Sequence, residues 1–352
     1  MVAPLPQIIQ FSAPYRVDVV EQAPSSLPAG HVRVRTRYSG ISSGTELTVY
    51  RGSNPYLNRR WDPYGRLFVD GDGAITYPVA GVGYSEVGSV VEVADDVADS
   101  PEGPQVGQRI WGMWGHRGEA VLPAGTLAGR VLPEGMDPLA ATFARVGAVA
   151  LNALLAADVH VTETVAIFGQ GVIGLLTSRL AALNGAEVAA VDTFARRLKY
   201  AEEYGARILL NPTTTDCAAE LRRLTGNRGV DVAIEMSGSY RALHEAIRSV
   251  AVDGRTVAAG FYQGDAMGLR LGEEFHHNRV QIVASQIGGV PAGLAGRWNP
   301  DRLLQAFLGL IASGAVDPLG LVTHVLPARQ AAAAFDLLHE RPEDALQIVL
   351  EF

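Results

Sequence analysis

TVAIFGQGVIGLLTSRLAALNGAEVAAVD, residues Thr164–Asp192, is the stretch that decides how this chain folds. It begins with the apolar run Val165–Phe168, passes through the glycine-rich turn Gly169–Gly174 and continues with apolar residues at helical spacing. A second β-like run, Glu187–Val191, ends at an acidic residue, Asp192. Strand, glycine turn, helix, strand and acid in this order are typical of a dinucleotide-binding fold. The sequence therefore predicts a nucleotide site; the alternative is a glycine-rich turn in a doubly wound sheet that binds nothing.

The three glycines of this turn have separate expected roles. Gly169 permits the tight turn, Gly171 lets the backbone approach a pyrophosphate, and Gly174 lets the helix pack close to the strand. The helix N-terminus then offers free N–H groups and a partial positive charge to the phosphates. Within this stretch we expect the cofactor to contact Gly169, Gly171, Val172, Ile173, Gly174 and Asp192.

The choice between NAD and NADP is expected to depend on Asp192. Its carboxylate would accept hydrogen bonds from the adenosine ribose diol and would repel a 2′-phosphate, so NAD is favoured over NADP. Arg196 and Arg197 follow closely; we expect that Arg197 stacks on the adenine or that both side chains face solvent. Further cofactor contacts are expected near the ends of later strands, at Ser237, Gly260, Phe261, Ser285 and Ile287.

The composition narrows the class of protein. A length of 352 residues predicts about two domains, and 48% hydrophobic with 19% charged residues is ordinary for a globular chain. A net charge of −8 provides no basic surface, so nucleic acid is not an expected partner. We find neither a signal-peptide pattern nor an apolar run of about 20 residues, so no membrane partner is expected and the cytoplasm is the expected compartment. The single cysteine, Cys217, excludes an internal disulfide and a multi-cysteine zinc site.

The rest of the chain predicts a second, β-rich domain. Residues 1–135 contain short alternating runs broken by Gly, Pro and Ser, whereas the pattern over Ala140–Ala157 is helical. Asp301–Ser313 predicts another helix, and the final residues predict strand, helix, strand, as if the tail returned to the first domain. We therefore expect a dinucleotide domain at 139–301 and a second domain from 1–138 and 302–352. The six strands expected for one complete Rossmann sheet are Val165–Phe168, Glu187–Val191, Arg207–Leu210, Val230–Glu235, Thr256–Gly260 and Val280–Ser285.

Four segments in order resemble the medium-chain dehydrogenase/reductase superfamily, whose best-known members are zinc-type alcohol dehydrogenases. Ser39–Gly52 is similar to the family's G-I-C-G-T-D-x-H-x-x-x-G segment, Gly83–Val90 to G-H-E-x-x-G-x-V, and Val106–Gly112 to its G-D-R-V strand; the glycine-rich block follows. The resemblance implies an α/β fold, in which a GroES-like β-rich catalytic domain accompanies the Rossmann doubly wound parallel sheet. It also implies an oxidoreductase.

The departures from the family pattern concern its two zinc sites. The family's catalytic Cys and His ligands correspond here to Ser43 and Tyr84, and a hydroxyl is a poor zinc ligand. The four-cysteine lobe is also missing, because Trp111–His116 continues directly into Glu119. We therefore expect no zinc. Within the superfamily, GISSGTE with GYSEVG resembles a zinc-free branch that includes bacteriochlorophyllide a dehydrogenase.

Without a metal, protein hydroxyls must manage the charge and proton of the reacting oxygen. Thr45 matches the family position of a proton-relay hydroxyl, Ser43 is a further hydroxyl, and Tyr84 is our first choice as acid/base or oxyanion donor. The alternative is that Tyr84 only fills the volume that zinc and its ligand vacated. Glu46 matches a carboxylate near the cofactor that would orient Thr45 or accept a proton. Arg145 would replace missing positive charge and bind an alkoxide or an anionic group; the alternative is an ion pair.

Two further segments are candidates for substrate contact. Arg59, Arg60 and Trp61 lie between the two family motifs, where a loop often borders the substrate cleft, although such clusters are more often exposed surface. Gln286 follows the last predicted strand and is expected to face the substrate. His276 is the last candidate; it adjoins His277, and two neighbours in a strand would point to opposite faces and ligate a metal poorly.

The sequence thus predicts a zinc-independent, NAD(H)-dependent oxidoreductase that interconverts a secondary alcohol and a ketone on a polar or cyclic small molecule. Two alternatives remain open: a reductase of an activated C=C bond, and a protein that binds NAD(H) as a sensor or scaffold without turnover. Family members commonly dimerise through the last strand of the nucleotide sheet, here Val280–Ser285, so a homodimer is expected.

Overall fold

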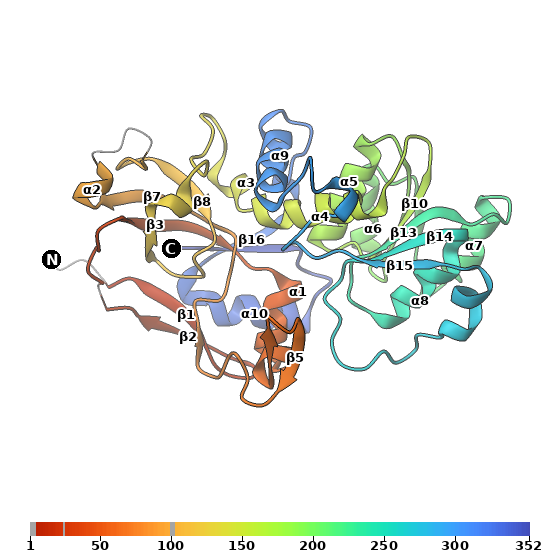
Figure 1. Cartoon of the computed structure of the whole chain (residues 1–352), viewed down its shortest axis with the longest axis horizontal. Coiled ribbons are helices and arrows are strands. Elements are labelled where there is room, and N and C mark those ends of the chain that lie inside the picture. The colour runs from red at the N-terminus through yellow and green to blue at the C-terminus, as the bar shows by residue number, and fades with distance from the viewer. Residues whose placement is uncertain (1–4, 24, 99–102) are drawn as a thin grey trace. The chain divides into compact units, whose positions relative to one another are not determined.

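The chain forms two compact units in the computed structural model, which describes residues 5–23, 25–98 and 103–352 (Figure 1). One unit contains Met1–Arg145 and Asp317–Phe352, and the other contains Val146–Val316. The sequence analysis placed the corresponding boundaries at 138/139 and 301/302.

The second unit is built on a six-stranded parallel sheet. Its order, β12-β11-β10-β13-β14-β15, is that of a Rossmann sheet, so the predicted fold class is confirmed. The strands begin and end as follows: β10 Thr164–Phe168, β11 Glu187–Val191, β12 Ile208–Leu210, β13 Val230–Glu235, β14 Val250–Ala258 and β15 Gln281–Ala284. The predicted β14 began six residues too late, because the structure also pairs Val250 with Val230 ahead of an irregularity in the ladder.

Helices cover both faces of this sheet, with α5 and α8 on opposite sides (Figure 1). On one face, Leu243 and Ile247 of α8 pack into a core with Phe168, and Leu175 and Leu176 of α5 are also fully buried. The helices of the unit are α4 Ala144–Ala157, α5 Val172–Leu183, α6 Ala195–Glu203, α7 Cys217–Leu224, α8 Tyr240–Ser249 and α9 Pro300–Ala312.

Helix α9 belongs to this second unit, although the sequence analysis assigned most of it to the other. A Cβ on Gly147 of α4 would lie 2.0 Å from the ring of Phe307, so α9 packs on α4 at close range. This packing removes four apolar side chains of α9 from water, which stabilises the arrangement. They are Leu303, Leu304, Phe307 and Leu308.

The first unit is organised around antiparallel strands. Its larger sheet has the order β16-β17-β3-β7-β8, with β9 also pairing with β3, and its smaller sheet has the order β2-β1-β6. The strands are β1 Gln7–Ala13, β2 Arg16–Glu21, β3 His31–Gly40, β6 Val79–Ala80, β7 Glu86–Val93, β8 Arg109–Gly112, β9 Glu119–Pro123, β16 Val322–Pro327 and β17 Gln347–Glu351. The helices are α1 Ser43–Arg51, α2 Asp95–Ala98, α3 Pro138–Ala141 and α10 Ala331–Glu340.

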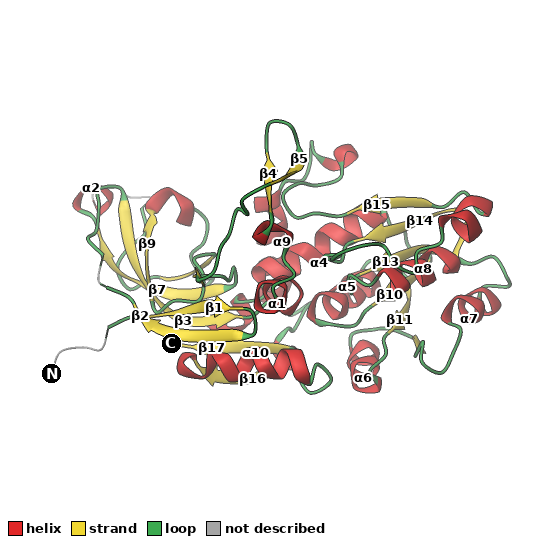
Figure 2. Ribbon diagram, turned by 90° about the horizontal axis from the view of Figure 1, so that it is seen from below, coloured by secondary structure: helices red, strands yellow, loops and turns green. Residues whose placement is uncertain are grey.

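The C-terminal segment completes this unit. Val349 of β17 pairs with Gly40 of β3, and α10 contributes Phe335, whose ring meets Phe11 edge to face at 4.9 Å. Both rings are fully buried in one core with Ile348. Two ribbons that are far apart in sequence, β3 and β17, therefore run side by side in Figure 2.

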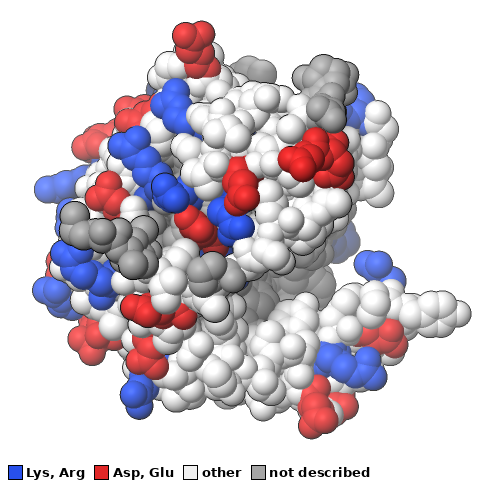
Figure 3. Space-filling view, turned by 90° about the vertical axis from the view of Figure 1, so that its left-hand side faces the viewer, with Lys and Arg blue, Asp and Glu red and all other residues white. Residues whose placement is uncertain are grey.

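Charges on the outer side of this sheet occur as cross-strand pairs. Arg33 lies 2.7 Å from Glu92, and Arg35 lies 3.1 Å from Glu119. The face drawn in Figure 3 accordingly shows basic and acidic side chains interspersed. Among the described residues, the structure contains no helix with the length and apolar character needed to cross a membrane.

Candidate active site

The glycine turn after β10 has the shape that each glycine was expected to permit. Gly169 has φ +90°, and a Cβ there would lie 2.8 Å from the Cβ of Ser237. A Cβ on Gly174 would lie 1.9 Å from the Gly169 carbonyl oxygen, so the first turn of α5 packs directly on the loop. A Cβ on Gly171 would meet nothing within 4 Å, which leaves open space beside the N-terminus of α5.

The backbone of the glycine turn holds Asp192 in place at the carboxyl end of β11. One carboxylate oxygen accepts the Gln170 N–H at 2.7 Å, and the other accepts the Phe194 N–H at 2.8 Å. Each oxygen keeps a second lone pair for a ribose hydroxyl. The Arg197 guanidinium lies 4.0 Å from Asp192 and 4.9 Å from the centre of the Phe194 ring. Its expected stacking on adenine stays a prediction.

A buried carboxylate that the sequence analysis overlooked, Glu235, organises the carboxyl ends of β13 and β14. It accepts hydrogen bonds from the Ser237 N–H at 2.7 Å, the Gly238 N–H at 3.0 Å and the Tyr262 hydroxyl at 2.5 Å, and also from the Ser237 hydroxyl. Burial raises the pKa of Glu235, and burial followed by the Glu235 charge raises that of Tyr262. The expected cofactor residues Ser237, Gly260 and Phe261 therefore lie on a braced edge. The sequence signal that could have identified Glu235 is its position as an acidic residue at the end of the apolar run Val230–Glu235.

Hydrogen bonds also hold the turn after β15. The Gln286 side chain, which was expected to face the substrate, takes part in them. The Gln286 side-chain oxygen accepts the Gly288 N–H at 2.6 Å, so this side chain folds back on its own turn. The Asn152 amide donates to the carbonyls of Gln286 and Gly289 at 3.2 and 3.0 Å. Ser285 and Ile287 flank the same turn, where Ser285 donates its N–H to Ala258.

The predicted substrate residue His276 lies on the amino-terminal side of β15, and its contact with substrate stays a prediction. His276 and His277 are exposed and continue the helical segment Leu271–Phe275, not a strand, and they precede β15. In a parallel sheet the amino ends of the strands lie at the edge opposite the carboxyl ends, and the nucleotide turn is at the carboxyl edge. The ion pair of Arg279 with Asp253, at 2.8 Å, fixes this segment beside the start of β14.

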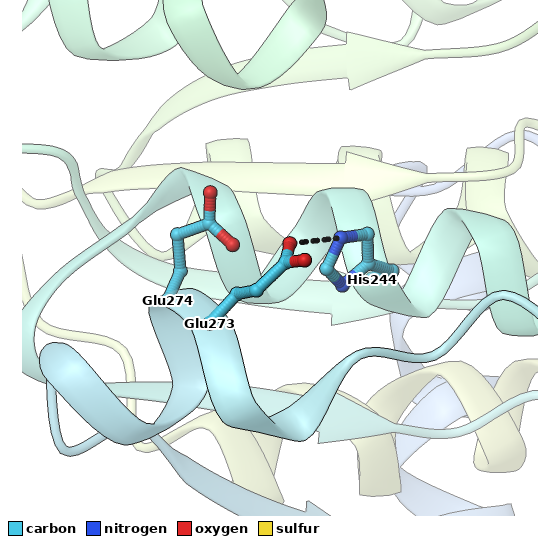
Figure 4. Close-up of side chains that lie close together, drawn as sticks. All are labelled: His244, Glu273 and Glu274. Atoms are coloured by element: carbon cyan, nitrogen blue, oxygen red, sulfur yellow. Dashed lines mark ion pairs between the residues drawn. The ribbon is translucent and has the colours of Figure 1, made fainter.

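One group of possible metal ligands among the described residues lies in the same region. His244, Glu273 and Glu274 offer ligand atoms within 4.8 Å of one another (Figure 4). However, Arg270 contacts His244 Nε2 at 3.0 Å, and Arg248 contacts Glu274 at 3.4 Å. Arginines thus occupy the positions that an ion would need, and the group is better described as a charge network.

In the first unit, Tyr84 meets hydroxyls from the start of α1. It shares a short hydrogen bond with Ser42 and donates to Thr45 Oγ1 at 3.3 Å. Ser43, the hydroxyl that the sequence analysis selected, is the adjacent residue, and the structure brings Ser42 to Tyr84 instead. Ser42 is the N-cap of α1, so its side chain stands outside the helix, whereas Ser43 is already the first helical residue.

Tyr84 remains a neutral phenol over the ordinary pH range. Burial raises the pKa of Tyr84, and the Glu46 charge raises it further, while Ser42, Thr45 and the Arg145 charge act in the opposite direction. Burial lowers the pKa of Arg145, and the proximity of Tyr84 opposes that effect. Arg145 thus lies close enough to Tyr84 to influence it electrostatically, and its role beside a reacting oxygen stays a prediction.

Beneath Tyr84, Glu46 belongs to a fully buried set of polar groups. The Ser42 N–H donates to Glu46 Oε1 at 2.9 Å, and His116 Nε2 lies 2.7 Å from Glu46 Oε2. The side chains of His116 and Glu46 are both 0% exposed. The sequence analysis gave His116 no role; its partner Glu46 is 70 residues away in sequence.

The same histidine reaches a second carboxylate through a serine. His116 Nδ1 lies 2.5 Å from Ser39 Oγ, which lies 2.9 Å from Glu86 Oε1, and Glu86 Oε2 accepts the Trp114 N–H at 2.7 Å. Burial raises the pKa of Glu86. Burial also lowers that of His116, but Glu46, by its charge and hydrogen bond, and then Glu86 outweigh it, so the pKa of His116 is raised.

Arg59, Arg60 and Trp61 lie on a β-hairpin of the first unit, not on an open loop. Strand β4 (Arg59–Asp62) pairs with β5 (Leu67–Asp70). Arg59 is engaged inside this hairpin by an ion pair with Asp70 at 2.7 Å. The Trp61 ring packs edge to face on Phe68 at 5.3 Å and stays 37% exposed.

Comparison with known proteins agrees with this architecture. A family model described as "Zinc-binding dehydrogenase" matches residues 172–298. D-guloside 3-dehydrogenase of Escherichia coli (strain K12) is 29% identical over 97% of this chain and 98% of its own length. A 2-desacetyl-2-hydroxyethyl bacteriochlorophyllide A dehydrogenase of Cereibacter sphaeroides is 28% identical over 92% of this chain and 91% of its own. The crystal structure of 2R,3R-butanediol dehydrogenase from Bacillus subtilis has a TM-score of 0.78 at 22% identity, and 99% of each chain is covered.

A complete Rossmann sheet and a separate β-rich unit are the combination expected for a dehydrogenase of the two-domain type. Over nearly its whole length the chain is similar to zinc-type alcohol dehydrogenase-like members of the medium-chain dehydrogenase/reductase superfamily. These relatives support an oxidoreductase that acts on CH–OH groups. Similar solved structures hold NADH in one case and NADP in another.

Proposed function

We propose that this chain is an NAD(H)-dependent dehydrogenase that interconverts a secondary alcohol and a ketone on a polar or cyclic small molecule, without a catalytic zinc. The observation that carries the proposal is the hydroxyl cluster of Tyr84, Ser42 and Thr45. Within it, Tyr84 aligns with one of the family's zinc ligands, and Ser42 adjoins Ser43, which aligns with another. Relatives named for a D-guloside and for butanediol support a sugar-like, cyclitol-like or natural-product-like alcohol as the substrate class.

The groups around Tyr84 do not suit a zinc ion. They provide one phenol and two neutral hydroxyls, while the nearby Glu46 already accepts from Ser42 and contacts His116. Zinc in proteins prefers thiolate, imidazole and free carboxylate. Metal analysis of the purified enzyme by mass spectrometry, together with turnover after dialysis against EDTA, tests this part. Stoichiometric zinc whose removal abolishes turnover would contradict it.

The residues at the carboxyl edge of the nucleotide sheet fit NAD. Gly171 leaves room beside the N-terminus of α5 for a pyrophosphate, and Asp192 presents a fixed carboxylate for a ribose diol. The bound nicotinamide would supply the hydride. Comparing apparent KM for NADH and NADPH tests the choice, and an equal or lower KM for NADPH would contradict it.

Tyr84 then manages the substrate oxygen. As a neutral phenol it can donate a hydrogen bond to a ketone oxygen while it accepts one from Ser42. In ketone reduction its proton passes to the oxygen as the carbinol forms, and in alcohol oxidation the proton returns. The positive charge of Arg145 stabilises the developing oxyanion or phenolate.

A panel of cyclic polyols, keto sugars and enones, assayed by NADH absorbance, separates this function from its alternatives. Turnover of the polyols and keto sugars is the expected result. Turnover of enones alone would favour C=C reduction. NADH binding without turnover of any compound would favour a sensor or scaffold.

We further propose a cytoplasmic homodimer. The last strand of the nucleotide sheet, β15, lies at the sheet edge and pairs on one side only with β14, which leaves backbone groups for an identical strand from a second copy. Size-exclusion chromatography with light scattering tests this. A monomer at micromolar concentration would contradict it.

A further inference from the structure

The buried set formed by Glu46, His116, Ser39 and Glu86 is larger than the proposed chemistry at Tyr84 requires. Four groups from three separate parts of the chain are joined by three hydrogen bonds, with distances of 2.7, 2.5 and 2.9 Å. All four side chains belong to residues that are at most 1% exposed. The set is therefore shielded from bulk solvent in the folded protein.

The three hydrogen bonds of this set determine how many protons it carries. Each of the three hydrogen bonds needs one proton, and each oxygen or ring nitrogen can be a donor only if it carries one. The Ser39 hydroxyl provides one proton, and a neutral imidazole provides a second. With both carboxylates ionised, the third bond has no proton. The set therefore retains one additional proton, and its net charge is −1 and not −2.

His116 is the group best placed to carry this proton. An imidazolium donates from both ring nitrogens, to Glu46 on one side and to Ser39 on the other, and Ser39 can then donate to Glu86. Hydrogen bonds from a charged donor to a carboxylate are the stronger kind. The raised pKa of His116 agrees with this placement.

The other charged and titratable neighbours of the set are few among the described residues. Arg117 lies close enough to Glu86 for their charges to interact, and Tyr84 interacts with both Glu46 and Arg145. Arg117 attracts the Glu86 carboxylate into the ionised form, which also favours the proton on His116.

The set reaches Tyr84 through Glu46. One Glu46 oxygen faces His116 and the other holds the N–H of Ser42, the residue whose hydroxyl meets Tyr84. We propose that His116, as an imidazolium retained in this set, is a positioning residue that fixes Glu46 and thereby the Ser42–Tyr84 hydrogen bond. The proposal rests on the proposed role of Tyr84 in the dehydrogenase reaction.

The first test reads the proton directly and needs no substrate. Histidine is labelled with ¹⁵N in the whole protein, and His116→Gln identifies the His116 signals. We expect both ring nitrogens of His116 to carry protons at a pH where an ordinary histidine, whose pKa is near 6.5, has already lost one. In Glu86→Gln the amide can donate to Ser39, so His116 should lose its Nδ1 proton. A wild-type His116 ring that loses one proton at the same pH as an ordinary histidine would overturn the proposal.

The second test asks whether His116 positions Tyr84. In His116→Gln the amide nitrogen can replace Nε2 and keep the Glu46 contact, whereas in His116→Asn it can replace only Nδ1. We expect kcat to fall at least about tenfold more in the asparagine variant, with KM for NADH unchanged in both. His160→Gln, at a 69% exposed side chain, is the control.

These outcomes separate the two levels of inference. Equal kcat in both His116 variants, with both folded by circular dichroism, would overturn the positioning role while leaving the dehydrogenase function intact. If Tyr84→Phe has wild-type kcat, the proposed role of Tyr84 fails, and the ¹⁵N spectra still decide whether His116 retains its proton.

Discussion

Tyr84 is the residue on which the proposed chemistry depends most directly. Tyr84→Phe removes the hydroxyl that meets Ser42 and Thr45 but keeps the ring. Because acid–base or oxyanion stabilisation by one group contributes about 10²–10⁴-fold, we expect kcat to fall at least about tenfold. Steady-state kinetics measures the fall, and NADH fluorescence should show unchanged binding.

Tyr64→Phe is the matched control for this prediction. Tyr64 lies in the turn between β4 and β5 and is 99% exposed, so the loss of its hydroxyl should change neither kcat nor KM. A Tyr84→Phe enzyme with wild-type kcat would show that this tyrosine only fills space.

Arg145 is predicted to act through its charge. Arg145→Ala removes the cation near Tyr84 and is expected to reduce kcat at least about tenfold, whereas Arg145→Lys should retain more activity. NADH binding should not change in either variant. Equal activity of the alanine and lysine variants would argue against a role of the charge.

Ser42 and His116 show why residue-scale prediction from sequence was incomplete. The motif comparison placed a hydroxyl near Tyr84 but selected Ser43, because the alignment has one extra residue and cannot show where the helix begins. His116 lacked any local signal: its partners Glu46, Ser39 and Glu86 are all more than twenty residues away in sequence. Glu86 lay within a quoted motif but had no assigned role.

At the scale of single elements, two glycines in the turn between β10 and α5 allow a controlled comparison, because an added methyl group would meet different surroundings at each. A Cβ on Gly174 would lie 1.9 Å from a backbone oxygen, whereas one on Gly171 would meet nothing within 4 Å. We expect Gly174→Ala to destabilise the fold by about 1–3 kcal/mol. Gly171→Ala should leave stability unchanged and weaken NADH binding, because its methyl group enters the space left for the pyrophosphate.

Thermal unfolding and NADH titration measure both effects of this pair. The opposite result, with Gly171→Ala unfolded early and Gly174→Ala unchanged, would mean that the turn differs from the one described. Normal NADH affinity in Gly171→Ala would remove the support for a pyrophosphate at this position.

Elements were predicted well where the signal was local. The bounds of β11 and β13 agree with the sequence, because each is a short apolar run between clear breakers. The assignment of α9 was different, because its membership in the second unit depends on Phe307 packing against Gly147, a contact that no local pattern contains.

For the whole molecule, the additional proton retained on His116 makes the free energy of unfolding depend on pH. The pKa of His116 is raised in the folded protein, so its contribution is complete below 6.5, the ordinary histidine value, and is lost as the pH rises through the folded pKa. Glu86, whose pKa is also raised, acts with the same sign. We expect the free energy of unfolding to fall as the pH rises from 6.5 through the folded pKa of His116.

Urea unfolding at pH 7 to 9 measures this slope. Glu86→Gln removes the need for the third proton, so its stability should change less with pH than that of the wild type. Parallel slopes for the two proteins would argue against a proton stored in this set.

The pairing of β17 with β3 has a consequence for synthesis on the ribosome. Val349 and Gly40 are more than three hundred residues apart, so the central sheet of the first unit lacks a strand until nearly all the printed sequence has been translated. The second unit, by contrast, consists of one uninterrupted segment that ends at Val316 and can fold as soon as it emerges. The nascent chain therefore exposes an unpaired edge of β3 while the nucleotide sheet folds. The sheet of the unit that contains Tyr84 is completed only when β17 has been made.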